Sequence, residues 1–103
     1  MKEQRVPSSY HLVTQKCPCY CGGEGVLMLV VCPHCRELMA RCDEVDELIR
    51  DIHNPQFVGE DSICHPDQLC PKCGLGRYGE FRPATEAEIQ AGGFINDQYR
   101  RWR

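Results

Sequence analysis

The chain has 103 residues, a formal net charge of −3 at pH 7 and nine cysteines. This length suits one domain and leaves no room for a separate catalytic domain. The negative charge disfavours nucleic acid as a default partner, because nucleic acid is itself negatively charged.

The cysteines and the absence of long apolar stretches indicate a reducing compartment. Residues 1–16 contain no apolar run of signal-peptide length, and the longest apolar run, residues 26–31, is too short to cross a membrane. Disulfides seldom persist in the cytoplasm, and an odd number of cysteines cannot all pair within one chain. We therefore expect a cytoplasmic protein, not attached to a membrane, whose cysteines bind metal.

The first half of the chain predicts an arm followed by a β-hairpin. Residues 1–16 mix charged residues, proline and serine with little periodicity, as in an N-terminal arm that ends in a short edge strand. Residues 26–31 are apolar and rich in branched side chains, which predicts a buried strand, and residues 37–42 are its expected returning partner. The sequence CPHC at residues 32–35 joins them as a knuckle, a tight turn that carries two cysteines.

A helix over about residues 44–53 is expected to follow the hairpin. Asp43 is a suitable N-cap, and the next apolar residues recur at i, i+3, i+4 and i+7, as on one face of a helix. These residues are Val45, Leu48, Ile49 and Ile52. Pro55 disfavours helix in the residue before it, so the helix ends there and a polar loop follows.

The second half predicts another knuckle, a strand and a short helix. The sequence CPKCG at residues 70–74 repeats the knuckle pattern, and residues 76–82 are expected to return as a strand. Thr85 and Glu88 have the spacing of a capping box. A helix over about residues 86–91 is therefore expected, ended by the glycines that follow.

The two knuckles have the spacing of a tetrahedral metal site. A two-residue gap lets both sulfurs of one turn reach the same ion, and two such turns supply four ligands. The expected ligands are Cys32, Cys35, Cys70 and Cys73. Thiolates are soft ligands that favour zinc, and iron is the alternative metal for the same set.

The paired CPxC and CPxCG knuckles resemble those of zinc-ribbon and rubredoxin-like proteins, through Cys32, Cys35, Cys70 and Cys73. The resemblance implies that each knuckle lies at the end of a β-hairpin. The chain departs from the pattern at Arg36, where glycine is usual, and in the long interval between the knuckles. We expect a small, metal-stabilised α+β fold of zinc-ribbon-like antiparallel β-hairpins with one or two short helices.

A further group of thiols, Cys17, Cys19 and Cys21, lies in the sequence CPCYCGGEG. These three could hold a second zinc ion with one more donor. The donors for that position are Cys42, Cys64 and His65. Alternatively, Cys17 and Cys19 join the first knuckle in one site, or the three thiols bind no ion and Cys42 packs as a small hydrophobic side chain. Spacing leaves this choice open.

The predicted elements divide the chain into an arm at residues 1–16, a zinc-binding domain at residues 17–95 and a basic, aromatic tail at residues 96–103. Charge is unevenly distributed, because residues 37–67 hold nine acidic residues against two arginines. The middle and the ends of the chain are therefore expected to face different partners.

The cysteine pattern favours a structural metal over catalysis. A catalytic zinc keeps one position open for water, whereas four thiolates complete its shell. The adjacent Cys64 and His65 do not by themselves provide the geometry of a nucleophile and its base. We therefore expect a protein-interaction or regulatory module and no enzyme. The alternative is a nucleic-acid-binding zinc ribbon that uses the Tyr, Arg and Trp side chains of residues 99–103.

Overall fold

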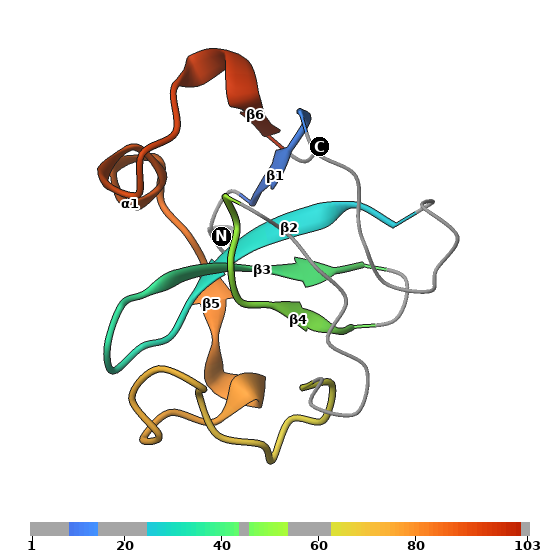
Figure 1. Ribbon diagram of the computed structural model, residues 1–103, viewed down its shortest axis with the longest axis vertical. Coiled ribbons are helices and arrows are strands. Elements are labelled where there is room, and N and C mark those ends of the chain that lie inside the picture. Colours follow the sequence, from blue (N-terminus) through green and yellow to red (C-terminus); the bar gives the residue numbers. More distant parts are fainter. Residues whose placement is uncertain (1–8, 15–24, 44–45, 54–62, 102–103) are drawn as a thin grey trace, which may run out of the picture.

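The computed structural model describes residues 9–14, 25–43, 46–53 and 63–101. Its elements in chain order are β1 (Tyr10–Leu12), β2 (Leu27–Val31), β3 (Leu38–Cys42), β4 (Leu48–Ile49), η2 (Tyr78–Glu80), β5 (Arg82–Pro83), α1 (Glu86–Ala91), η3 (Asn96–Gln98) and β6 (Tyr99–Arg101). Figure 1 shows β2, β3 and β4 in the middle of the molecule, with α1, β1 and β6 towards one end and the segment of residues 63–81 towards the other. Within these described ranges, no helix has the length and apolar character needed to span a bilayer.

Antiparallel pairing joins the strands in the order β4-β3-β2-β1-β6, and β5 also pairs with β2. All five residues of β2 are buried, as expected for a central strand of branched apolar residues. One edge of β2 pairs with β3 along its whole length. The other edge is shared by β1, near Met28, and β5, at Val30 and Val31. The two strands predicted for the first hairpin are thus confirmed. The first knuckle follows β2, which is hydrogen-bonded to other strands along both of its edges.

Side chains alternate along the strands, so the sheet separates two hydrophobic clusters. The helix-side core comprises Leu12, Leu27, Leu29, Val31, Leu38, Ala40, Cys42, Ile49, Ile52, Ala84, Ile89, Phe94 and Tyr99. The knuckle-side core comprises Val30, Cys32, Met39, Leu48, Ile63, Cys70 and Tyr78. The second cluster contains one cysteine from each knuckle, so the fold buries the two knuckles together on one side of the sheet.

The helix predicted over residues 44–53 is wrong in the part of that range that the structure describes, residues 46–53. Leu48 and Ile49 form β4, which pairs with β3, and they point into opposite cores. Just before β4, Asp46 has φ 60° and its amide donates to the Cys42 carbonyl over 2.8 Å. The edge of β3 offers backbone hydrogen-bond groups that a helix would have left unpaired, so pairing overrides the helical spacing. Asp43, expected to cap that helix, instead accepts a hydrogen bond from the Val26 amide over 2.6 Å.

The strand predicted over residues 76–82 is also wrong for most of its length. Arg77 forms a single bridge with Leu69, residues 78–80 form the 3₁₀ helix η2, and only Arg82 continues into β5. The Tyr78 hydroxyl donates to the Asp46 carbonyl over 2.6 Å, which joins this segment to the residue two positions before β4. Tertiary contacts of the Tyr78 ring therefore replace an extended strand.

The predicted capping box and C-terminal helix are confirmed. The Glu88 amide donates to Thr85 Oγ1 over 3.2 Å, and the Thr85 amide donates to Glu88 Oε1 over 2.9 Å. The Arg82 guanidinium donates to both Glu88 oxygens over 3.0 and 2.7 Å. These bonds fix the start of α1 beside β5 and bring the helix back onto the sheet.

Parts of the predicted arm and tail belong to the same sheet. β1, from the arm, pairs with β6, from the tail, with His11 opposite Arg100. Tyr99 is buried, and its ring packs edge-on against Tyr10 at a centroid distance of 5.8 Å. Residues 10–12 and 99–101 therefore help to close the helix-side core.

Candidate metal centre

The first knuckle begins where the buried strand β2 ends. Cys32 follows β2 directly and is fully buried. The Arg36 amide donates to the Cys32 carbonyl over 2.8 Å, which closes the turn before the chain returns as β3. Cys35 lies on the outer side of this turn and is exposed.

The second knuckle repeats this geometry. The Gly74 amide donates to the Cys70 carbonyl over 2.9 Å, and the Cys70 amide donates to the Gly76 carbonyl over 2.7 Å. Cys70 is buried and Cys73 is half-buried. Each knuckle therefore contributes one inner and one outer sulfur.

The two turns also match in backbone conformation but differ in residue type. Gly74 has φ 70° and Arg36, at the equivalent position, has φ 59°. Glycine adopts this left-handed conformation readily, whereas a residue with a Cβ atom loses roughly 1–2 kcal/mol. Arg36 thus occupies a position where glycine would be more favourable.

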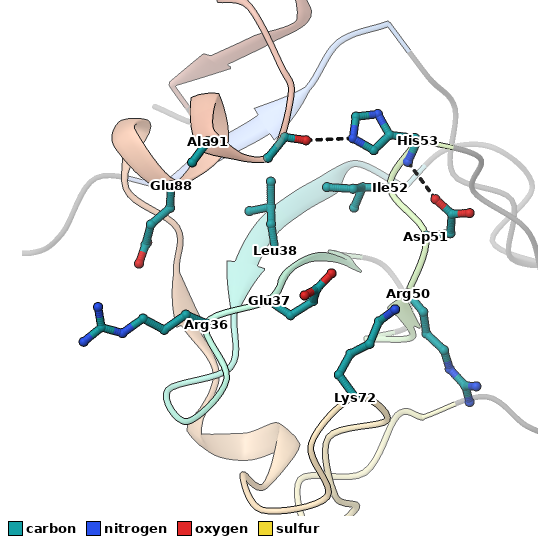
Figure 2. A pocket seen from close by; sticks show the side chains of 11 residues that line it. Arg36, Glu37, Leu38, Arg50, Asp51, Ile52, His53, Lys72, Glu88 and Ala91 are labelled. Carbon is teal, nitrogen blue, oxygen red and sulfur yellow. Dashed lines mark hydrogen bonds between the residues drawn. The ribbon is translucent and has the colours of Figure 1, made fainter.

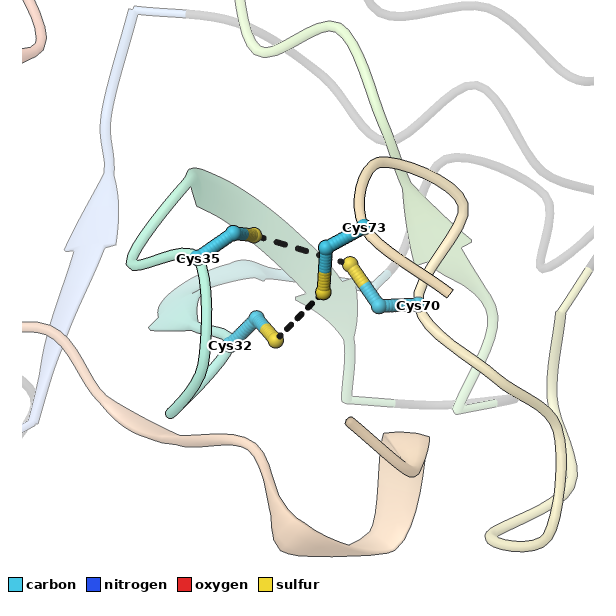
Figure 3. Close-up of side chains that lie close together, drawn as sticks. All are labelled: Cys32, Cys35, Cys70 and Cys73. Carbon is cyan, nitrogen blue, oxygen red and sulfur yellow. Dashed lines mark hydrogen bonds between the residues drawn. The ribbon is translucent and has the colours of Figure 1, made fainter. Parts of the chain in front are cut away.

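The structure brings the four knuckle cysteines together. The sulfur atoms of Cys32, Cys35, Cys70 and Cys73 all lie within 4.8 Å of one another. Figure 3 shows the four side chains converging from the two turns, with Cys32 Sγ 3.7 Å from Cys73 Sγ and Cys35 Sγ 3.8 Å from Cys70 Sγ. A disulfide would bring two sulfurs to about 2 Å. Four sulfurs at about 2.3 Å from a zinc ion, at tetrahedral angles, stand about 3.8 Å apart. The cluster therefore has the dimensions of a tetrahedral metal site.

Backbone amides surround the sulfurs. The amides of His34, Lys72 and Leu75 donate to the sulfurs of Cys32, Cys70 and Cys73 over 3.4, 3.3 and 3.4 Å. Hydrogen bonds of this kind favour the thiolate, which is the form that binds metal.

The cluster shifts the pKa values of its two outer thiols in opposite directions. The amides of Leu75 and Gly76 lower the pKa of Cys73, whereas partial burial and the neighbouring sulfurs raise the pKa of Cys35. Thiolates held this close repel one another, so four of them require a cation between them. The four sulfurs thus form a donor set that could hold a metal ion.

The other predicted donors in the described part of the chain do not join this cluster. Cys42 lies in the helix-side core, across the sheet, and is fully buried, as expected for a small hydrophobic side chain. Cys64 and His65 are exposed and lie outside the group of close donors. Cys17, Cys19 and Cys21 lie outside the described residues, so the second site stays a prediction.

The sequence analysis did not identify Gly76 as a residue of the site. A Cβ atom on Gly76 would lie 2.7 Å from the Cys32 sulfur, so the segment after the second knuckle approaches the first knuckle only because this position has no side chain. The signal for it is the second glycine in the sequence CGLG, two residues after the knuckle.

The fold and the site define a small antiparallel β domain with few helices and a cluster of four cysteines that could hold a metal ion. No known protein family, no curated protein and no solved structure matches this chain.

Proposed function

We propose that this chain is a small cytoplasmic zinc-binding protein in which Cys32, Cys35, Cys70 and Cys73 hold one structural zinc ion. The convergence of four sulfurs within 4.8 Å carries the proposal. Zinc is the metal that this donor set favours, because thiolates are soft ligands and tetrahedral sulfur coordination suits an ion without geometric preference of its own.

The metal has a structural role in this proposal. Four thiolates leave no open position for a water molecule or a substrate. Cys32 and Cys70 also belong to the knuckle-side core, so the metal would join two segments that share only a small set of apolar contacts. A small domain gains stability from such a crosslink. This role requires no catalysis.

The domain is proposed to act as a protein-interaction or regulatory module. A net charge of −3 and the burial of Tyr99 both weigh against the nucleic-acid alternative, since Tyr99 is one of the rings that would have stacked on bases. Binding to single-stranded nucleic acid, measured at increasing salt, tests that alternative. Absence of binding at low salt eliminates it.

Native mass spectrometry combined with metal analysis tests the zinc proposal. The protein purified under reducing conditions should carry one tightly bound zinc ion, and the Cys32→Ser and Cys70→Ser variants should lose it. A Cys64→Ser variant is the matched control, because Cys64 is exposed and outside the cluster. A Cys19→Ser variant reports on the second predicted ion. A fully folded protein that contains no metal would contradict the proposal, and bound iron with its visible colour would change the metal assignment.

A further inference from the structure

An open cavity of about 670 Å³ lies beside the metal cluster. Figure 2 shows that its lining comes from both knuckles, from the turn after β4 and from the end of α1. Leu38 and Ile52 form an apolar floor and are buried members of the helix-side core. Arg36 from the first knuckle and Lys72 from the second contribute cations to the rim.

Arg36 is the most informative residue of this cavity. Its backbone has the left-handed conformation that Gly74 adopts in the other knuckle, and this conformation disfavours any side chain. Among the described residues, none forms an ion pair or a hydrogen bond with the Arg36 guanidinium. The side chain is therefore present at a cost in stability that no ion pair or hydrogen bond within the described structure offsets. Strain of this kind is typical of residues kept for binding.

The lining of the cavity carries three cations, Arg36, Arg50 and Lys72, against three carboxylates, Glu37, Asp51 and Glu88. Lys72, like Arg36, forms no ion pair with any described residue. Of the acidic lining residues, Glu88 is already neutralised by a bidentate ion pair with Arg82, at 2.7 Å. Because Arg82 lies outside the lining, the balance of the remaining lining charges is positive, although Glu37 and Asp51 keep their negative charges. The two knuckle cations thus remain available to carboxylates of a ligand.

The shape of the site favours a segment of a protein over a small molecule. Sites for small molecules are mostly enclosed and apolar, whereas much of this lining, including Arg36, Glu37 and Lys72, is exposed. The carboxylates of Glu37 and Asp51 on the same rim would repel the continuous run of phosphates of a nucleic acid. A peptide can instead place uncharged residues beside Glu37 and Asp51. An extended peptide can place separate carboxylates beside the cations and an apolar side chain over the floor.

We propose that this cavity binds an acidic peptide segment of a partner protein, with peptide carboxylates at Arg36 and Lys72 and an apolar side chain on Leu38 and Ile52. The inference rests on the proposed function, because the metal would hold the two knuckles at the separation that places both cations on one rim. It adds to that function a surface and the chemistry of its partner.

Selection from a random dodecapeptide library against the purified protein, whose metal content is measured in parallel, tests the inference. The selected peptides should be rich in Asp and Glu around an apolar residue, and their binding should weaken as salt rises. Arg36→Gly and Lys72→Ala should each reduce the affinity for these peptides by at least about tenfold. Arg100→Ala, which removes an exposed arginine from β6, is the matched control and should bind as the wild type does.

Arg36→Gly separates binding from folding. This substitution relieves the left-handed strain, so the variant should be at least as resistant to urea as the wild type while it loses peptide affinity. Selection of no peptides, selection of peptides without acidic residues, unchanged binding by both variants, or nucleic-acid binding that depends on Arg36 would each overturn the inference. If the protein contains zinc but binds no peptide, the proposed metal site stands and the proposed docking site is wrong. If the protein contains no metal but its peptide binding still depends on Arg36, the docking site stands and the proposed metal site is wrong.

Discussion

The backbone of Gly76 packs directly against the sulfur of Cys32, so that a Cβ atom at position 76 would stand 2.7 Å from Cys32 Sγ. The same Cβ atom would lie 3.0 Å from Cδ2 of the His34 ring. These distances are shorter than ordinary van der Waals contacts. The approach of one knuckle to the other is therefore limited by the size of a single residue.

Gly76→Ala should weaken metal binding and lower the free energy of unfolding of the metal-loaded protein by about 1–3 kcal/mol, because the added methyl group displaces the Cys32 sulfur. Zinc competition with a chromophoric chelator and urea denaturation measure the two effects. Gly74→Ala is the control, since no atom lies within 4 Å of its Cβ position and its cost comes from φ 70° alone. Equal metal affinity in Gly76→Ala and wild type would show that the contact does not position the sulfur.

Removal of the metal should loosen the second knuckle more than the sheet. The segment of residues 63–81 contacts the sheet through the knuckle-side core and through bonds such as that from Tyr78 to Asp46, whereas β2 and β3 share a complete ladder. After chelation, amide exchange in residues 70–76 should accelerate at least about tenfold more than exchange in β2. Hydrogen-exchange mass spectrometry compares the two states. Equal acceleration throughout would indicate that the metal stabilises the domain only as a whole.

Cys42→Ala should leave the metal content unchanged although it replaces a cysteine. Cys42 lies across the sheet from the cluster and is fully buried, so the substitution removes packing atoms and not a ligand. We expect a loss of about 1 kcal/mol in the free energy of unfolding, as for the removal of a small buried group. Metal analysis and urea denaturation check the two statements. Loss of the metal in this variant would place Cys42 in the site.

The ion pair between Arg82 and Glu88 should contribute to stability only above acidic pH. The side-chain hydrogen bond from Arg82 lowers the pKa of Glu88 from 4.5 to about 2. A carboxyl group whose pKa is lowered by folding stabilises the protein above its unfolded pKa, and the contribution disappears as pH falls from about 4.5 towards 2. Glu88→Gln should therefore cost about 1 kcal/mol at pH 7 and progressively less below pH 4.5.

Urea denaturation of wild type and Glu88→Gln at each pH measures this difference. Protons also compete with the metal for the cysteine sulfurs, but that effect is common to both proteins and cancels in the comparison. Thr85→Ser, which keeps the hydroxyl of the capping box, is a control that should show no such pH dependence. A difference between the proteins that stays constant down to pH 3 would contradict the pKa assignment.

Local interactions made several elements predictable. The capping box of Thr85 and Glu88 depends on residues three positions apart, so its hydrogen bonds follow from the sequence alone. The strands β2 and β3 are likewise evident from a run of branched apolar residues next to a tight turn. Glycine directly after the second cysteine of the second knuckle marks the left-handed position at Gly74.

The helix predicted over residues 44–53 shows that local spacing alone could not decide the secondary structure of this segment. Leu48, Ile49 and Ile52 have spacings that suit a helix, but two of them are also neighbours in a short strand. The choice depended on the free edge of β3, which lies elsewhere in the chain and offers hydrogen bonds that no local pattern records. The burial of Tyr99 was likewise not predictable from local sequence, because it depends on pairing between β6 and β1.

The sequence alone indicated that Cys32, Cys35, Cys70 and Cys73 would lie together, because ligand chemistry and the two-residue spacing within each knuckle are local properties. It left the role of Cys17, Cys19 and Cys21 open. Only the tertiary structure decided which sulfurs are inner and outer, that Cys42 lies across the sheet, and that Arg36 and Lys72 share one rim. These relations depend on how the sheet brings distant segments together. The free energy of such packing comes from contacts between residues far apart in the chain. It therefore cannot be read from any single segment of the sequence.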